Sequence, residues 1–169
     1  RKEAGLVLEQ RIDALAKAQS ILSNSRRADG DMREAVNHAL RPFRSRDDQF
    51  VIDGPPVWLS AGQVFTMMLA LNELATNALK YGALSHADGQ VHLCWSAGRP
   101  NTADPFRFVW AEVNGPPVRQ VARKGFGSRI LKDVIPVEFM GESVLSLDST
   151  GIRFELMTQM NRLGCPETD

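Results

Sequence analysis

The chain has 169 residues, which predicts a single compact domain or one domain with a helical appendage. Hydrophobic residues make up 43% and charged residues 24%, a balance that excludes intrinsic disorder. Twenty basic residues against twenty acidic ones give zero formal net charge, without the basic excess typical of proteins that bind nucleic-acid phosphates. No apolar run of about 18 residues and no signal peptide are visible. We expect a cytoplasmic protein with no membrane segment in this chain and no nucleic-acid partner.

The first third of the chain carries two helical patterns and a short strand. Residues 5–23 place apolar side chains on one stripe, as an amphipathic helix does. Asp31 is a typical N-cap residue for a second, shorter helix, which Pro42 closes. Residues 49–53 then form a strand pattern that ends at a Gly-Pro-Pro turn.

The strongest helical pattern begins after Ser60 and runs to about Tyr81, with Gly82 as its stop. Its apolar positions follow one another at helical spacing and predict a continuous buried stripe, made of Val64, Met68, Leu71, Ala75 and Ala78. This helix is therefore expected to lie in the core.

The second half of the chain changes to a period of two, which is typical of strands. Residues 91–96 alternate in polarity, and residues 106–111 are apolar on both faces, as in a central strand. A short helix is expected after Gly127, followed by a hairpin of residues 143–147 and 152–157. Helices come early and strands mostly late, which favours an α+β fold with helices on one face of a sheet.

The long helix also carries a polar patch. Glu73, Asn77 and Lys80 lie at i, i+4 and i+7 and so share one face, with Thr76 beside them. An amide oxygen and an ammonium group on one face can hold a hydrated Mg²⁺ ion and a polyphosphate, and a carboxylate can orient or deprotonate a nearby hydroxyl. The alternative is a solvated helix face with a weak ion pair.

Two further patterns are weak signals when taken alone. Gly125-Phe126-Gly127-Ser128 precedes a helix, a placement that lets backbone amides approach a phosphate, although most such glycine pairs are ordinary turns. Trp110-Ala111-Glu112 ends the central strand, and a carboxylate there can accept a hydrogen bond from an exocyclic amine such as that of adenine. The alternative for Glu112 is an ordinary residue at the boundary of the sheet.

Taken together and in this order, the three signals resemble the ATP-binding domain of bacterial sensor histidine kinases of the HWE type, within the wider GHKL ATPase superfamily. The most specific segment is LNELATNALKYGALS at residues 71–85, followed by WAE at 110–112 and GFGSR at 125–129. The resemblance covers residues 5–157.

The resemblance implies a Bergerat-type fold, a two-layer sandwich in which a mixed sheet packs on helices, with ATP between the long helix and a short lid at residues 118–124. Asn77 would ligate Mg²⁺, and Glu73 would be the catalytic carboxylate. Together with Asn77, the nucleotide-binding residues would be Lys80, Tyr81, Glu112, Gly115, Gly125, Gly127 and Ser128.

The same resemblance implies a domain division and a set of partners. Residues 1–28 would be a remnant of the dimerisation and histidine-phosphotransfer helix, 29–160 the ATP-binding domain, and 161–169 a flexible tail. The chain would transfer the γ-phosphoryl group of ATP to a histidine outside it, for relay to a response regulator. Its other partners would be its own phosphoacceptor helix hairpin and a second copy in a homodimer.

The chain also departs from the family pattern. Two family histidines and one family glycine are replaced, by Gln19, Asn72 and Asn114 respectively, and Pro136 is expected to shorten the helix after the glycine loop. These replacements keep open a catalytically silent adaptor of the same fold, although the retained polar face of the long helix argues against it. A GHKL ATPase or serine kinase outside two-component signalling is a third alternative, disfavoured by the Trp-x-Glu motif.

Overall fold

The computed structural model describes residues 12, 16, 30–117, 126–149 and 151–165. Of the predicted helix at 5–23 the structure describes residues 12 and 16, both helical, and the predicted lid, Gln19 and Gly125 lie outside the described residues. The elements in chain order are β1 (Gly30–Asp31), α2 (Met32–Leu40), η1 (Arg41–Phe43), β2 (Phe50–Asp53), β3 (Trp58–Leu59), α3 (Ala61–Tyr81), η2 (Ala83–Ser85), β4 (Gln90–Ala97), β5 (Pro105–Val113), α4 (Phe126–Arg129), η3 (Ile130–Val134), α5 (Ile135–Glu138), β6 (Glu142–Asp148), β7 (Gly151–Gln159) and η4 (Met160–Arg162).

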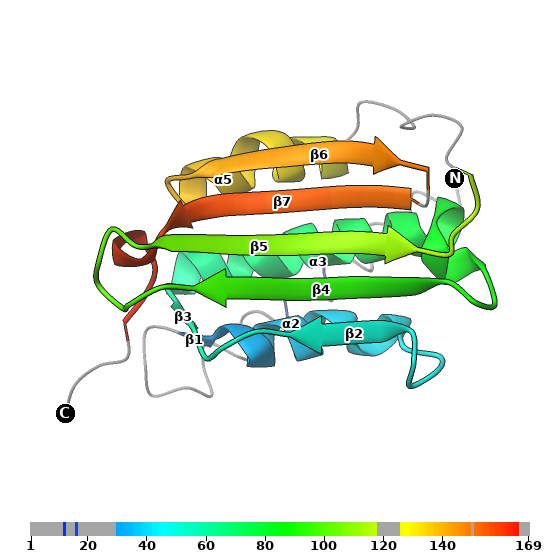
Figure 1. Ribbon diagram of the computed structural model, residues 1–169, viewed down its shortest axis with the longest axis horizontal. Helices are drawn as coiled ribbons and strands as arrows, with labels where there is room; N and C mark the ends of the chain where they lie inside the picture. Colours follow the sequence, from blue (N-terminus) through cyan, green and yellow to red (C-terminus); the bar gives the residue numbers. More distant parts are fainter. Residues whose placement is uncertain (1–11, 13–15, 17–29, 118–125, 150, 166–169) are drawn as a thin grey trace.

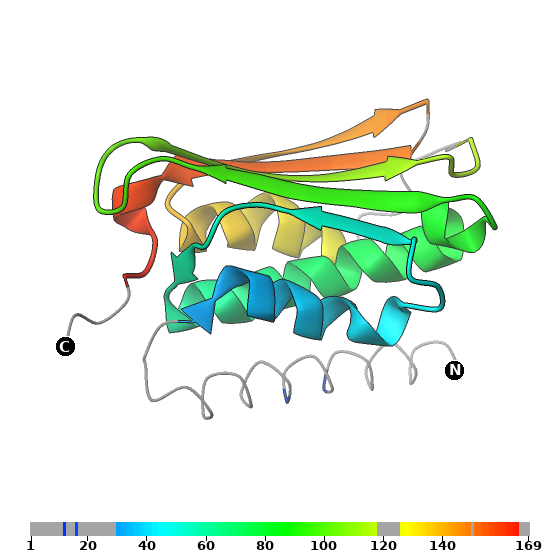
Figure 2. The ribbon, with the colours of Figure 1, turned by 60° about the horizontal axis from the view of Figure 1, so that its bottom comes forward.

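The described elements form two layers, with α2, α3, α4 and α5 on one face of a sheet (Figures 1 and 2). The five strands of this sheet have the order β2-β4-β5-β7-β6, and β2 runs parallel to β4 while the other neighbours are antiparallel. The expected α+β sandwich with a mixed sheet is therefore confirmed. A separate pair of two-residue strands, β1 and β3, joins the start of α2 to the segment before α3.

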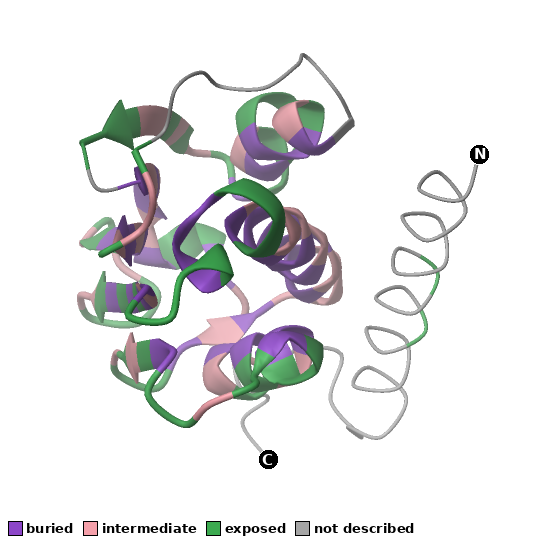
Figure 3. Cartoon of the chain, turned by 90° about the vertical axis from the view of Figure 1, so that its right-hand side faces the viewer, coloured by how far each residue is buried: buried purple, intermediate pink, exposed green. Residues whose placement is uncertain are grey.

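The central position of β5 is also confirmed, since β4 and β7 pair with it on either side. Phe106, Phe108 and Trp110 on its inner face are fully buried, and Val109 on the outer face is only 5% exposed. Burying a large apolar side chain stabilises a fold by roughly 1.5–3 kcal/mol, so β5 contributes much of the core. Figure 3 shows the buried positions gathered between the sheet and the helices.

Helix α3 begins and ends where its sequence predicts. Ser60 accepts a hydrogen bond from the Gln63 amide at 3.3 Å, and the Gln63 side chain accepts one from the Ser60 amide at 3.0 Å, which completes a capping box. The amide of Gly82 closes the last turn on the carbonyl of Ala78. The predicted apolar stripe is buried at every position, so α3 is the central helix of the helical layer.

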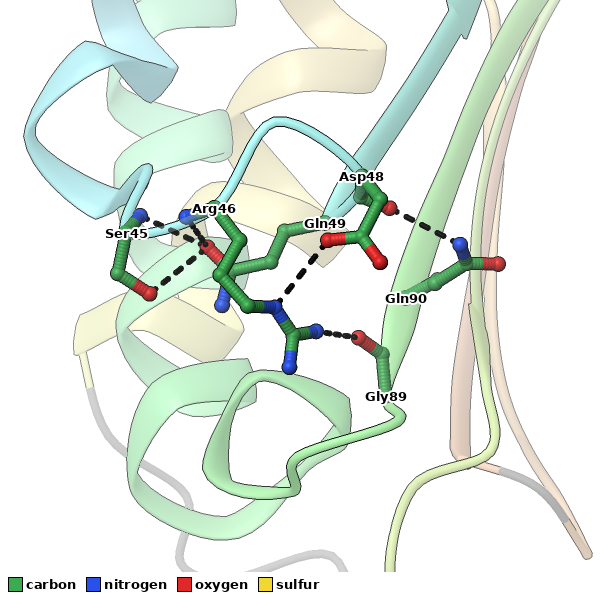
Figure 4. A network of polar contacts seen from close by, with 6 residues as sticks. All are labelled: Ser45, Arg46, Asp48, Gln49, Gly89 and Gln90. Carbon is green, nitrogen blue, oxygen red and sulfur yellow. Dashed lines mark hydrogen bonds and ion pairs between the residues drawn. The ribbon is translucent and has the colours of Figure 1, made fainter.

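The loop between η1 and β2 is held by a polar network around Gln49 (Figure 4). The buried Gln49 carboxamide oxygen accepts hydrogen bonds from the Ser45 amide at 2.8 Å, the Ser45 hydroxyl and the Arg46 amide. Arg46 also pairs with Asp48 and donates to the carbonyl of Gly89, just before β4. The network therefore ties the loop to the start of β4, the strand that β2 pairs with.

Pro136 does not shorten the helix after the glycine loop, contrary to the prediction. The helical segment continues from α4 through η3, a π turn in which the Ile135 amide donates to the Ile130 carbonyl, into α5. In this register residue 136 would donate to the Leu131 carbonyl, but proline has no N–H. The hydroxyl of Ser143, on β6, supplies that bond at 2.7 Å instead. The proline is thus accommodated by a wider turn and a donor from the sheet.

The packed structure extends past the boundary predicted at residue 160. The Asn161 amide donates to Thr102 at 2.7 Å, the Arg162 carbonyl accepts from Gln63, and Leu163 is buried. Among the described residues, no helix has the length and apolar character needed to cross a membrane.

The hydrogen bond from the Ser143 hydroxyl to the Leu131 carbonyl is expected to stabilise the fold. We expect Ser143→Ala to lower the free energy of unfolding by about 1–2 kcal/mol, because a carbonyl loses its donor. Ser146→Ala, on the opposite face of the same strand, is the control and should change it by less than about 0.5 kcal/mol. In a Pro136→Ala background, where residue 136 regains an amide, the Ser143→Ala cost should shrink. Urea unfolding of wild type, Ser143→Ala, Pro136→Ala and the double variant measures this coupling. Equal losses of unfolding free energy on Ser143→Ala in both backgrounds would contradict it.

Candidate functional site

One face of α3 carries the predicted polar residues. Glu73, Thr76 and Asn77 are half-buried, and Lys80 and Tyr81 are exposed in the last turn. Glu73 and Lys80 are separated by about 10 Å along the helix axis, at 1.5 Å per residue. The face therefore changes from half-buried to exposed over about the length of a triphosphate chain, with the amide of Asn77 between the carboxylate and the ammonium group.

Helix α4 lies against this face at Glu73. A Cβ atom built on Gly127 would collide with Oε2 of Glu73 and would lie 3.1 Å from its Cδ. A side chain at 127 would therefore require the Glu73 carboxylate to shift, and Ser128 follows as a half-buried residue. The structure thus brings together two of the predicted residues, Glu73 and Gly127, from segments 54 positions apart.

Glu112 lies near the end of β5, where three elements meet. Its Oε2 accepts a hydrogen bond from the Ala83 amide at 3.2 Å, directly after the end of α3. A Cβ on Gly82 would lie 2.9 Å from the Cδ of Glu112, and one on Gly151 would lie 2.6 Å from its Cβ. Glu112 is therefore enclosed by the end of α3 and by the turn between β6 and β7.

The carboxylate of Glu112 is only partly satisfied. The residue is 3% exposed, and Oε1 is a buried oxygen with no hydrogen-bond partner among the described residues. Burial raises the pKa of Glu112, while the amides of Ala83 and Ile152 oppose that rise. A buried acceptor without a donor costs free energy, so this oxygen is suited to a ligand that brings an N–H group.

The chain leaves β5 through Asn114 and Gly115. Asn114 replaces a family glycine and has a φ of 55°, in the left-handed region. Asparagine enters this region more readily than most residues, so the backbone conformation is accessible to the replacing residue. Gly115 is half-buried directly after it, and Asn72, which replaces a family histidine, is 9% exposed within α3.

Three contributors to the site were not predicted as such. Gly82 was predicted as the stop of the helix, Ala83 only as part of the segment that carries the resemblance, and Gly151 lies at the turn of the predicted hairpin, yet all three contact Glu112. The turn prediction for Gly151 is consistent with its φ of +143°, which favours glycine. No local sequence pattern indicates these contacts, because they join segments that are far apart in the chain.

A dedicated metal cage is absent from the described part of the chain, where no group of three or more His, Cys, Asp or Glu side chains could hold an ion. Mg²⁺ does not need one, because it keeps several water ligands and binds through one or two protein oxygens and substrate phosphates. The oxygen donors of Asn77 and Glu73 fit that requirement.

Comparison with known proteins relates this chain to histidine kinases. The family model of the HWE histidine kinases matches residues 1–56. The blue-light-activated histidine kinase of Brucella ovis is 31% identical over 157 residues, and that of Brucella anthropi is 29% identical over 167 residues. These matches cover 92% and 98% of this chain but 32% and 34% of those proteins. The chain thus spans about a third of the length of these relatives.

Solved structures share the fold. The histidine kinase domain of the blue-light activated histidine kinase from Erythrobacter litoralis superposes with a TM-score of 0.68 at 17% identity, over 92% of this chain and 75% of that one. The ATP-binding domain of PrrB from Mycobacterium tuberculosis gives a TM-score of 0.57 at 18% identity, over 80% of this chain and 98% of that one. The two layers described above are therefore those of histidine kinase catalytic domains.

The buried state of Glu112 predicts a pH dependence of stability. Because its pKa is raised in the folded state, folding retains the proton of Glu112 more tightly than the unfolded chain does. The stability that this residue contributes is greatest below the ordinary glutamate pKa of about 4.3 and is lost as the pH rises through the folded value. The difference in unfolding free energy between wild type and Glu112→Gln should therefore fall with rising pH.

Glu155 provides a control of opposite sign. Partial burial raises its pKa, but hydrogen bonds from Arg153 and Arg107, at 2.8 and 2.9 Å, outweigh burial and lower it. The difference in unfolding free energy between wild type and Glu155→Gln should therefore rise with pH. Urea unfolding at a series of pH values measures this difference for Glu112→Gln and for Glu155→Gln. If the two differences change with pH in the same direction, the opposite pKa shifts of the two residues are contradicted.

Proposed function

We propose that this chain, which is related to the HWE histidine kinases, is the ATP-binding catalytic part of a protein histidine kinase. It would bind ATP with Mg²⁺ and transfer the γ-phosphoryl group to a histidine outside the chain, for relay to a response regulator. The observation that carries this proposal is the buried Oε1 of Glu112, which has no hydrogen-bond partner among the described residues, in a side chain that lies against Gly82 at the end of α3.

Glu112 would recognise the base. Its Oε1 would accept a hydrogen bond from the exocyclic amine of adenine, while the Ala83 amide holds Oε2 at 3.2 Å. Such an acceptor discriminates against a base with a carbonyl oxygen at that position, because two acceptors would then face each other without a proton. Gly115 would border the base from the segment after β5.

The exposed half of the α3 face would hold the phosphates. The Asn77 side-chain oxygen would ligate Mg²⁺, which supplies charge neutralisation to the phosphoryl groups when bound. Lys80 would contribute a further positive charge, with Tyr81 beside it. The segment from Gly125 to Ser128 would form the phosphate loop, whose described part lies against Glu73. Positioning and charge stabilisation would then account for most of the rate enhancement.

Glu73 would be the catalytic carboxylate, which orients or deprotonates the attacking histidine side chain. Residues 1–28 would be what this chain retains of the dimerisation and phosphotransfer helix, with the catalytic domain starting at 29. The partners would be the phosphoacceptor hairpin, a second copy in a homodimer and a response regulator. A cytoplasmic location stays a prediction from composition.

The silent adaptor is the second candidate. It drew its support from the replaced family residues, and the backbone of Asn114 weakens that support, because asparagine tolerates the φ of 55° found there. The two candidates differ in whether nucleotide binds at all.

Calorimetric titration with a non-hydrolysable ATP analogue tests the nucleotide site. We expect binding in the presence of Mg²⁺ and at least a tenfold weaker affinity for Asn77→Ala, because the variant loses the metal ligand. Without Mg²⁺ the two proteins should differ little. The matched control is Asn161→Ala, an exposed asparagine on η4 at the opposite end of β5, which should bind like wild type. A folded wild-type chain that binds no analogue at millimolar concentration would instead favour the adaptor.

Phosphotransfer to a histidine tests the role of Glu73. In the protein with its phosphoacceptor helix, we expect Glu73→Gln to slow autophosphorylation by about 100-fold or more while nucleotide affinity changes less than about twofold. Glu142→Gln, an exposed glutamate on the edge strand β6, serves as the control. Phosphate that resists mild acid, as phosphoserine does, would point to the serine kinase alternative.

A further inference from the structure

Two buried polar atoms without a hydrogen-bond partner among the described residues lie on the same strand. One is Oε1 of Glu112, and the other is the indole Nε1 of Trp110, whose side chain is fully buried. A buried N–H group costs free energy when no acceptor is present, as a buried oxygen does without a donor. The two atoms are complementary, because one can only donate and the other can only accept in its ionised form.

The strand places the two side chains next to each other. Residues 110 and 112 are two positions apart on β5, so both point from the same face, with their Cβ atoms about 6.5–7 Å apart. Trp110 is fixed there by Leu93 and Phe154, its partners in the neighbouring strands, and by edge-to-face contact with Phe50 at 6.4 Å between ring centroids. The indole therefore has little freedom to turn its N–H elsewhere.

We propose that Trp110 is a positioning residue, whose indole N–H orients Oε1 of Glu112 and thereby sets the preference of the site for a base with an exocyclic amine. The preference for the base rests on the function proposed above, but the orientation of the carboxylate does not. A small rotation of the Glu112 side chain or one bridging water completes the contact. In either case the indole favours the ionised carboxylate, which is the form that accepts from an amine.

The electrostatic surroundings of Glu112 agree with this role. After burial, which raises its pKa, the groups that lower it are the amides of Ala83 and Ile152 and the indole of Trp110. Charged or titratable side chains on the elements packed around Glu112, among them Lys80 and Tyr81 on α3, His92 on β4, Asp148 on β6 and Arg153 on β7, are not among the groups that shift its pKa. Trp110 is thus the side chain that favours the charged state of Glu112.

The test compares Trp110→Phe with wild type in the chain without nucleotide. Phenylalanine keeps an aromatic ring but has no N–H, so we expect the pKa of Glu112 to rise by about one pH unit. Carbon-13 NMR titration of the glutamate carboxyl groups measures it, and Glu112→Gln identifies the resonance. Trp95→Phe is the matched control, because the Trp95 indole donates to the Pro55 carbonyl at 2.7 Å instead, and it should leave the Glu112 titration unchanged.

A second measurement needs no variant of Trp110. In the wild-type protein the indole N–H resonance of Trp110 should shift with the same midpoint as the Glu112 carboxyl, while that of Trp95 should not. A Trp110 indole N–H resonance whose chemical shift does not change as Glu112 titrates would overturn the proposal. An unchanged Glu112 pKa in folded Trp110→Phe would also overturn it.

Nucleotide selectivity separates this inference from the proposed function. We expect the ratio of affinities for adenosine and inosine triphosphate to fall about tenfold in Trp110→Phe. A shifted Glu112 pKa with no nucleotide binding by wild type would support the positioning role and refute the kinase function. Nucleotide binding with an unchanged ratio and an unchanged pKa would refute the positioning role alone.

Discussion

The candidate site depends on one carboxylate that is buried where three elements meet. An ionised group withdrawn from water is costly unless polar partners replace the solvent. For Glu112 these are the Ala83 amide, at 3.2 Å from Oε2, and the Ile152 amide and Trp110 indole, which also favour its charged form. The surrounding backbone accommodates this arrangement, since side chains at 82 and 151 would occupy the space that Glu112 fills. The end of α3, the end of β5 and the turn between β6 and β7 are therefore linked through a single side chain. A displacement of any of these three elements would therefore move the Glu112 carboxylate and alter the site.

This linkage divides the site into two unlike halves. The half around Glu112 is enclosed, and its neighbours belong to the central strand and the core helix. The half formed by Lys80 and Tyr81 is exposed, at the solvent side of the last turn of α3. An enclosed half suits a flat, apolar group with few polar atoms, and an exposed half suits a highly charged one that keeps part of its hydration. A nucleotide combines these two chemistries in one molecule.

Periodicity in the sequence predicted the long helix, the central strand and the final hairpin, because each of these buries one regular set of side chains. It also placed Glu73 and Asn77 on one face, since helical spacing alone determines that. The surroundings of Glu112 could not be found in this way, because Gly151 reaches it only through the pairing of β7 with β5. The strands β1 and β3 are too short to show a period. The effect of Pro136 was predicted wrongly because the donor that compensates for it, Ser143, lies on another element.

The π turn of η3 has a consequence for the direction of the residues that follow it. A turn that holds one extra residue rotates everything after it by about 100° relative to a continuous α-helix. Gly127 before the turn faces Glu73 on α3, while Ile135 and Phe139 after it are fully buried. An uninterrupted helix of the same sequence would turn one of these sets away from its neighbours. Removal of one residue between 130 and 134 would therefore convert the π turn into a regular α-helical turn and leave Gly127 and the buried pair facing as they do now, whereas removal of a residue elsewhere in the helix would rotate one of them away.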